Sequence, residues 1–293
     1  MTRSVVITGG TRGIGRGLAR AFLDRGCKVA LCGRDAAGVE AALRELQGGS
    51  NAIGRVTDVT DRAQVAALWT AAAEAFGSVD IWINNAGATT ARKPLWGLDA
   101  GDADSVLAAN LGGVVNGSAV AAKGFLVQGH GRLWNMEGFG SDGRVMPGLS
   151  VYGSSKRAVT YLTAGLAADL EAERAGGAPD VRAALLSPGI VVTGLLLHDY
   201  TPSEYAKVRK VLNILADRVE TVAPWLADQV LADRTSNGGR VAWLTRRKAA
   251  ARFATAGFRK RSVLPDHLPD GPDGPDGPGA AGAAGGPGRG AAS

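Results

Sequence analysis

The stretch Thr8-Gly9-Gly10-Thr11-Arg12-Gly13-Ile14-Gly15 (residues 8–15) decides the fold. It follows a short apolar run, residues 4–8, and opens a segment with helical spacing, residues 13–26. Glycines in such a loop let the backbone turn tightly and come close to a pyrophosphate, while the N–H groups and dipole of the following helix attract the anion. The position between strand and helix predicts a dinucleotide-binding loop, with a purely structural turn as the alternative.

The same alternation of apolar strand and helical segment continues along the chain. Strands that are buried on both faces and joined by helices form a parallel sheet. At 293 residues the chain is long enough for one large domain. We therefore predict a single α/β domain, residues 1–245, with a doubly wound, Rossmann-like parallel sheet of seven strands. Strands are expected at 4–8, 28–32, 53–59, 79–83, 131–135, 181–187 and 240–244, and helices at 13–26, 36–47, 61–76, 103–128, 153–174 and 219–234.

Charge is distributed unevenly over the sequence. Residues 1–239 carry 24 basic and 23 acidic residues, so this body is nearly neutral, and no nucleic-acid partner is expected. Residues 240–262 hold no acid and eight cations: Arg240, Arg246, Arg247, Lys248, Arg252, Arg259, Lys260 and Arg261. With the interleaved aromatic side chains, this basic patch can rest on an anionic membrane surface, although solvated surface charge is the default interpretation.

The ends of the chain predict less structure. We expect a basic C-terminal extension at 246–264 and a disordered tail, rich in Gly, Pro, Ala and Asp, at 265–293. The first residues run directly into a strand, so no targeting segment and no membrane-spanning run are expected. The two cysteines, Cys27 and Cys32, form neither a disulfide framework nor a metal-ligand pattern.

Residues after the second to fourth strands are candidates for holding a nucleotide. Arg34, together with Arg12 of the loop, can accept a ribose 2′-phosphate, which favours NADPH; the neighbouring Asp35 keeps NADH open. Asp58, followed by Val59, can bind the adenine amino group or cap the next helix. The run Asn84-Asn85-Ala86-Gly87 offers small residues for close backbone approach and amides that can bridge strands.

The spacing of Tyr152 and Lys156 predicts the chemistry. Positions i and i+4 share one helix face, and an ammonium near a phenol lowers the pKa of the tyrosine. The phenol can then exchange a proton with a substrate oxygen. Asn110, a poor helix former inside a helical segment, can hold a water that relays protons to the lysine, or it is a satisfied core asparagine. Backbone groups of Pro188, Gly189 and Val191 can hold a nicotinamide carboxamide.

These motifs, in this order, resemble the short-chain dehydrogenase/reductase family over about residues 3–245. The resemblance implies an NAD(P)-dependent oxidoreductase, in a dimer, a tetramer or a complex with a related reductase. It also implies a catalytic tetrad of Asn110, a serine, Tyr152 and Lys156. The family's serine usually ends the fifth strand, about thirteen residues before the tyrosine. Here the nearest hydroxyl is Ser141, eleven residues before Tyr152, and Ser141 is the expected member.

The run NMEGFGSDGR (135–144) and the following VYGSSKRAV (151–159) resemble one branch of the family, the chlorophyll(ide) b reductases of the non-yellow-coloring type. This resemblance implies reduction of the 7-formyl group of chlorophyll b or chlorophyllide b to 7-hydroxymethyl, in a chloroplast stroma or against its thylakoid, or otherwise in the cytoplasm. Leu195-Leu196-Leu197 follow the PG motif and can cover an apolar substrate. The alternatives are a reductase of another hydrophobic carbonyl, such as a steroid, polyketide or acyl thioester, and a nucleotide-binding scaffold without activity.

Overall fold

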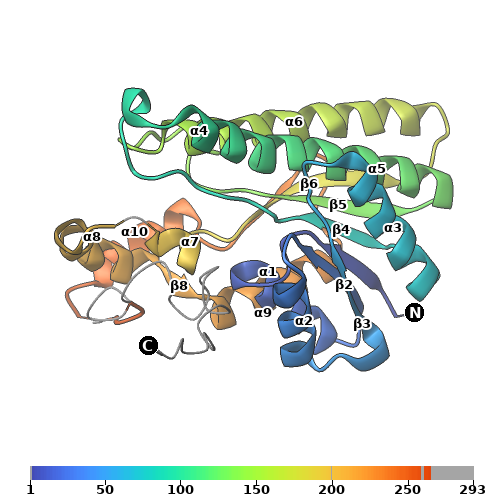
Figure 1. Ribbon diagram of the computed structural model, residues 1–293, viewed down its shortest axis with the longest axis horizontal. Helices are drawn as coiled ribbons and strands as arrows, with labels where there is room; N and C mark the ends of the chain where they lie inside the picture. Colours follow the sequence, from blue (N-terminus) through green and yellow to red (C-terminus); the bar gives the residue numbers. More distant parts are fainter. Residues whose placement is uncertain (1, 199, 259–260, 265–293) are drawn as a thin grey trace, which may run out of the picture.

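The computed structural model describes residues 2–198, 200–258 and 261–264, and its centre is a seven-stranded parallel sheet (Figure 1). The strand order is β3-β2-β1-β4-β5-β6-β9, which confirms the predicted Rossmann-like sheet. The chain reverses direction across the sheet between β1 and β4, where ligands of such folds bind at the carboxyl ends of the strands. The strands are β1 (Ser4–Ile7), β2 (Lys28–Gly33), β3 (Ala52–Val56), β4 (Ile81–Asn84), β5 (Gly131–Met136), β6 (Val181–Ser187) and β9 (Arg240–Ala242).

Helices cover both faces of the sheet because its strands are apolar on both sides. Val5 and Ile7 of β1 join the core beneath one set of helices, whereas Val6 between them joins the core on the opposite face. The first face is covered by α1 (Gly13–Leu23), α2 (Ala36–Leu46) and α9 (Val219–Ala232). The second is covered by α3 (Arg62–Phe76), α5 (Gly113–Gln128) and α6 (Ser150–Ala175) (Figure 1).

The segment predicted as one helix at 103–128 is interrupted. It comprises α4 (Ala100–Leu107), a π-helical turn (Ala108–Gly112) and α5. By length and composition alone, Ala100–Gln128 could cross a membrane, a possibility that the sequence expectation had not included. Core helices pass the same test, and α5 buries Val114, Ala121 and Phe125 against the protein interior.

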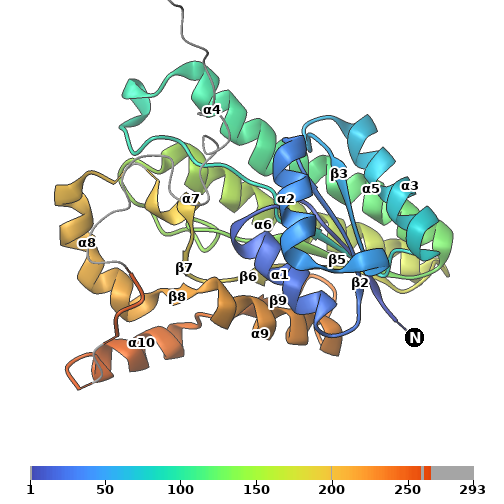
Figure 2. The same ribbon diagram turned by 60° about the horizontal axis from the view of Figure 1, so that its bottom comes forward.

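A second group of elements, here called the C-terminal lobe, lies beside one end of the sheet (Figure 2). It contains α7 (Gly194–Leu197), α8 (Pro202–Leu215) and α10 (Arg246–Thr255). A two-stranded parallel sheet of β7 (Val191–Val192) and β8 (Asp217–Arg218) connects it to the main body. Of these elements the sequence had indicated none as a helix or strand. The two 3-10 turns, η1 (Gly49–Asn51) and η2 (Leu95–Gly97), complete the described structure.

The buried carboxylate of Asp217 organises this lobe. It forms ion pairs with Arg252 of α10, at 2.8 Å, and with Arg261, and it accepts a hydrogen bond from the Trp243 indole at 2.6 Å. Lys248 lies over the Trp243 ring, 3.0 Å from its centroid. Part of the predicted basic patch therefore stabilises the fold instead of facing outward. The predicted tail, 265–293, lies outside the described residues.

Candidate active site

The glycine loop between β1 and α1 packs so closely on the end of β4 that side chains are excluded. Gly9 has a φ of +64°, and a Cβ atom there would lie 2.7 Å from the Cα of Ala86. At Gly15 a Cβ would lie 2.2 Å from the carbonyl oxygen of Gly9. The loop thus offers bare backbone beside the first turn of α1, and this cradle fits the pyrophosphate of a dinucleotide.

Asn85 fixes this loop. Its amide donates hydrogen bonds to the carbonyl oxygens of Thr8 and Gly9 at 2.9 and 3.0 Å. In return, the Thr8 hydroxyl accepts from the backbone N–H groups of Asn85 and Ala86 at 3.0 and 3.1 Å. Asn84 bridges β4 to β5 through Asn135, at 2.8 Å. The amides of the NNAG run therefore bridge neighbouring strands, one of the two roles considered from the sequence, while Ala86 and Gly87 remain small.

At the ends of β2 and β3, some polar residues cap helices and others are available to a ligand. Asp35 caps α2 by accepting from the Gly38 N–H at 2.7 Å, whereas Arg34 beside it is exposed. Asp58 does not cap α3, because Asp61 does so. Instead one Asp58 oxygen accepts from Thr60, at 2.9 and 2.8 Å, which leaves the other oxygen for a ligand. Val59 is buried in the core, and Arg12 immediately precedes α1.

Tyr152 and Lys156 lie in the first two turns of α6. The Lys156 ammonium is buried and donates to the carbonyl oxygen of Met136, at the end of β5, at 3.3 Å. It lies 6.0 Å from the centroid of the Tyr152 ring. In the described residues no hydrogen bond occupies the Tyr152 hydroxyl, so the phenol is available to a substrate oxygen.

The two side chains carry opposite pKa shifts. Burial raises the pKa of Tyr152 to about 12. Burial also lowers the pKa of Lys156 to about 8, against a smaller raising effect of the Glu137 carboxylate. The prediction that the lysine lowers the pKa of the tyrosine is thus wrong for this structure, because the ammonium is directed at Met136 and does not offset desolvation. A neutral phenol at pH 7 suits proton donation, the direction that reduction requires.

Asn110 lies in the π-helical turn between α4 and α5 and is fully buried. Its amide donates to the Ala88 carbonyl and to the Ser155 hydroxyl, both at 3.0 Å, and its side-chain oxygen accepts from the Ala88 N–H at 2.8 Å. The side chain is therefore satisfied by protein and ties the loop after β4 to α6. Such π-turns are frequent at functional sites, and this one brings Asn110 close to Gly87 and Lys156.

The residue that faces the tyrosine hydroxyl is Gly138. A Cβ atom at this position would lie 2.3 Å from the Tyr152 oxygen. Ser141, the expected hydroxyl of the tetrad, is buried and engaged elsewhere: it accepts from the Gly138 N–H at 3.2 Å and donates to the Lys156 carbonyl at 3.3 Å. No hydrogen bond joins Ser141 to Tyr152 in the described part of the chain. This geometry supports a positioning role for Ser141.

The loop after β6 closes the site from the other side. Gly189 has a φ of +73°, and a Cβ there would lie 2.6 Å from the Cβ of Leu244. Pro188 and Gly189 line the adjoining cleft, while the side chain of Val191 is buried in the core. Thr193, at the end of this loop, brings it to the glycine loop, because the Thr193 methyl carbon would lie 3.4 Å from a Cβ at Gly13.

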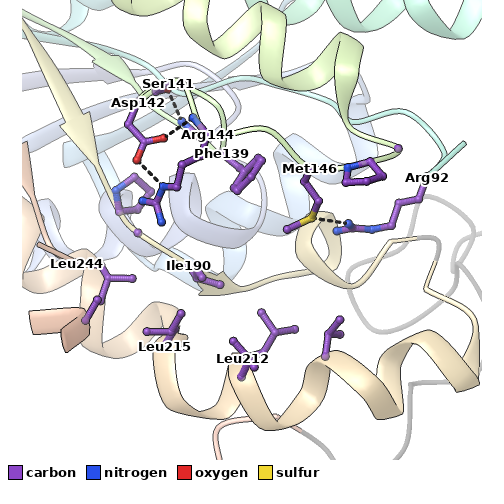
Figure 3. Close-up of a pocket in the computed structure, with 18 of the residues that line it drawn as sticks. Arg92, Phe139, Ser141, Asp142, Arg144, Met146, Ile190, Leu212, Leu215 and Leu244 are labelled. Atoms are coloured by element: carbon purple, nitrogen blue, oxygen red, sulfur yellow. Dashed lines mark hydrogen bonds and ion pairs between the residues drawn. The ribbon is translucent and has the colours of Figure 1, made fainter. Parts of the chain in front are cut away.

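A cleft of about 1340 Å³ opens beside Gly138 and runs between the sheet and the C-terminal lobe (Figure 3). One wall carries Phe139 and Met146, and the opposite wall carries Ile190, Leu212, Leu215 and Leu244. The predicted cover, residues 195–197, does not line it; α8 and the start of α10 do. The cleft is larger than the usual range for small-molecule sites, about 300–1,000 Å³, and its two apolar walls fit a broad, flat ligand.

Comparison with known proteins agrees with this geometry. Residues 3–201 match the family model for short chain dehydrogenases. The chain is 36% identical over 236 residues to the chloroplastic chlorophyll(ide) b reductase NOL of Arabidopsis thaliana, covering 78% of this chain and 65% of that protein. It is 30% identical over 280 residues to the probable chloroplastic chlorophyll(ide) b reductase NYC1 of Oryza sativa subsp. japonica, covering 88% of this chain and 53% of that protein. This chain thus spans between half and two thirds of these two relatives.

Among solved structures, a 3-ketoacyl-(acyl-carrier-protein) reductase from Brucella melitensis, complexed with NADH, matches with a TM-score of 0.69. It is 26% identical, and the match covers 82% of this chain and 96% of that one. A sheet of this order, a glycine loop at its switch point and a Tyr–Lys pair on α6 define a nicotinamide-dependent oxidoreductase. The chain belongs to the short-chain dehydrogenase family and is an NAD(P)-dependent oxidoreductase.

Proposed function

We propose that this enzyme reduces the 7-formyl group of chlorophyll b or chlorophyllide b to 7-hydroxymethyl. The observation that carries the proposal is the broad apolar cleft that opens at Gly138, where the Tyr152 hydroxyl lies. The names of the NOL and NYC1 relatives supply the substrate class. A formyl carbon at the end of a flat ring system can reach this point while Leu212, Leu215 and Phe139 cover the ring.

The residues present fit NAD(P)H. The backbone of the glycine loop would hold the pyrophosphate, through Gly9, Thr11, Gly13, Ile14 and Gly15. Asp58 and Val59 would hold the adenine. The small residues Ala86 and Gly87 would let the cofactor approach the backbone after β4. Pro188, Gly189 and Val191 would hold the carboxamide. When bound, the dihydronicotinamide supplies the hydride for the carbonyl carbon. Tyr152 donates its phenolic proton to the carbonyl oxygen as charge develops there. Lys156, directed at the Met136 carbonyl in this structure, would turn toward the phenolate that remains in order to stabilise it. Asn110 holds the loop after β4 against α6.

NADPH is the cofactor that we propose. Arg34 is exposed at the end of β2, and Asp35 is committed to capping α2, so a positive side chain and not a free carboxylate meets the ribose 2′ position. Measurement of kcat/KM with NADPH and with NADH tests this. In the Arg34→Gln variant, the ratio of kcat/KM with NADPH to kcat/KM with NADH is expected to be about tenfold smaller than in the wild type. An unchanged ratio of these two values would contradict the assignment.

The substrate proposal is tested by a panel of carbonyl compounds with purified protein and NADPH. Conversion of chlorophyllide b to the 7-hydroxymethyl pigment, followed by its absorption spectrum, is expected to exceed reduction of a ketosteroid or a 3-ketoacyl thioester. The ketoacyl thioester is the second candidate because the Brucella reductase shares the fold. Faster reduction of that compound, with no pigment conversion, would replace the proposal.

The chloroplastic names of the relatives favour the same compartment for a pigment-reducing chain. We further propose a homo-oligomer or a complex with a related reductase, as well as peripheral contact with an anionic membrane through Arg246, Arg247 and the exposed Phe253 and Phe258. Light scattering and co-sedimentation with anionic vesicles test these assignments. A monomer that stays in the supernatant would contradict both.

A further inference from the structure

The end of the cleft farthest from Asp142 and Arg144 carries a fixed cation, Arg92 (Figure 3). Its guanidinium lies over the Tyr200 ring, 4.1 Å from the centroid, and one of its N–H groups contacts the Met146 sulfur at 3.8 Å. A stacked guanidinium has lost much of its conformational freedom and keeps its fork of donors for a planar anion.

A second cation, Lys207 of α8, lines the same cleft. Among the described residues, the acid near these two cations is Glu204, one turn before Lys207. Glu204 is already bound, since one of its oxygens accepts from the Thr201 N–H at 2.9 Å and from the Thr201 hydroxyl at 2.7 Å. These hydrogen bonds lower the pKa of Glu204, and the charges of Arg92 and Lys207 lower it further. Within residues 2–198 and 200–258, these two cations and one hydrogen-bonded carboxylate leave an excess positive charge at this end of the cleft.

The opposite part of the cleft is arranged differently. There Arg144 pairs with Asp142 at 2.6 Å, and Arg240 pairs with the buried Glu137 at 2.7 Å. Arg246, at the start of α10, is a further cation that lines the cleft. Between the two parts lie the apolar walls. A ligand that reaches Gly138 with a carbonyl group and fills these walls therefore presents its far edge to Arg92 and Lys207.

We propose that Arg92 and Lys207 bind a carboxylate of the substrate, so that the cleft selects the free acid chlorophyllide b over its esters. The inference rests on the proposed function and refines it. Chlorophyllide carries a free propionate where chlorophyll carries an ester, and the guanidinium fork of Arg92 matches a carboxylate in two hydrogen bonds. An esterified pigment would contact the same apolar walls, but it would leave the positive charges of Arg92 and Lys207 without a counter-charge.

The test compares chlorophyllide b with its methyl ester, which has the same ring and the same formyl group. With NADPH, the wild-type enzyme is expected to favour the acid by about tenfold in kcat/KM, through KM, with kcat nearly equal for the two pigments. Arg92→Gln and Lys207→Gln are expected to reduce this preference to about twofold or less by raising KM for the acid alone. Arg92→Lys keeps the charge without the fork and is expected to be intermediate. Lys93→Gln is the matched control, because Lys93 is exposed and does not line the cleft.

A binding measurement without cofactor supplies an independent readout. Trp96 lines the cleft and is 91% exposed, so quenching of its fluorescence reports pigment binding. The dissociation constant for the acid is expected to rise about tenfold in Arg92→Gln and to stay unchanged in Lys93→Gln. Lys207→Gln, an exposed substitution, carries the test if loss of the Tyr200 stack impairs folding. Equal kcat/KM for acid and ester in the wild type would overturn the inference and leave the proposed function intact; no reduction of either pigment would overturn both.

Discussion

The glycine loop and the C-terminal lobe are held in opposite ways. Around the loop, Gly9 and Gly15 bring backbone against backbone, and uncharged groups of Thr8 and Asn85 close the contact. The lobe instead gathers two arginines and an indole onto one buried carboxylate, Asp217. The packing of the glycine loop depends on the absence of side chains at Gly9 and Gly15. The lobe depends on charged side chains that lie far apart in the sequence. Cofactor binding is thus expected to depend on close backbone packing in the loop, and substrate binding on the ion pairs that hold the lobe.

The largest expected effect lies between the two regions, at Tyr152. Tyr152→Phe removes the proton donor but keeps the ring, so kcat is expected to fall by about 10³-fold or more with the NADPH dissociation constant unchanged. Steady-state kinetics and fluorescence titration measure the two quantities. Retention of more than a tenth of the wild-type kcat would contradict the role of Tyr152.

The next effect tests the lobe. Asp217→Asn leaves Arg252 and Arg261 without their buried counter-charge, and we expect a loss of about 3–5 kcal/mol in the free energy of unfolding. Because these ion pairs and the Trp243 hydrogen bond hold the pKa of Asp217 below its usual value, the wild-type advantage is present at neutral pH and lost as the pH falls through that lowered pKa. Asp228→Asn, at a more exposed ion pair with Arg25, is the control, with an expected loss of about 1 kcal/mol or less. Equal losses in the two variants would contradict the distinction.

The next effect concerns the buried Lys156 on α6, whose pKa is lowered by burial. Its folded-state pKa of about 8 lies below the ordinary value, so between about pH 8 and 10 the unfolded chain binds more protons than the folded one. The unfolding free energy of the wild type is therefore expected to rise with pH in this window by up to about 3 kcal/mol relative to Lys156→Met. Denaturant titrations at pH 7 and pH 10 measure it. Parallel pH curves for the two proteins would show that Lys156 titrates normally.

The glycine loop is tested by Gly15→Ala. The added Cβ would meet the Gly9 carbonyl oxygen at 2.2 Å, so the loop must shift, and NADPH binding is expected to weaken by about 10- to 100-fold. Gly101→Ala in α4, where no atom lies within 4 Å of the added Cβ, is the matched control. Unchanged NADPH affinity in Gly15→Ala would mean that the loop is not the cofactor cradle.

The smallest effect concerns Ser141. Ser141→Ala removes its bonds to Gly138 and Lys156, and we expect less than a tenfold loss of kcat with a stability loss of about 1 kcal/mol. Ser154→Ala, at an exposed position on α6, is the control and should match the wild type. A loss of about 10³-fold in kcat would restore Ser141 as a catalytic hydroxyl.

Much of the fold could be predicted because its signals are local. The strands of the sheet are contiguous apolar runs, and the glycine loop, the NNAG run and the Tyr152–Lys156 pair each occupy a few consecutive residues. The lobe escaped prediction because α8 and α10 are polar helices whose order depends on pairs such as Arg252–Asp217, 35 residues apart in sequence. Its role in lining the cleft was assigned to residues 195–197 instead.

Within the site, the position of the Ser141 hydroxyl could not be predicted from the sequence spacing. Ser141 is the hydroxyl nearest in sequence to the position where the family carries its serine, yet the turn after β5 places Gly138 against the phenol and directs Ser141 at the carbonyl oxygen of Lys156. The pair Glu137–Arg240, 103 residues apart, left no local pattern at all. The pKa of Tyr152 depends on burial and on where the Lys156 ammonium is directed, and neither is encoded in the YxxxK spacing.

The most direct test of the central claim follows the transferred hydrogen itself. Purified protein is incubated with chlorophyllide b and NADPH that carries deuterium at both hydrogen positions of the nicotinamide C4, and the pigment is analysed by mass spectrometry and proton NMR. Formyl reduction in this cleft predicts 7-hydroxymethyl chlorophyllide with one deuterium on the new carbinol carbon, and no labelled product from Tyr152→Phe on the same time scale. Recovery of unreacted chlorophyllide b, or of a product without deuterium at that carbon, would contradict the assignment.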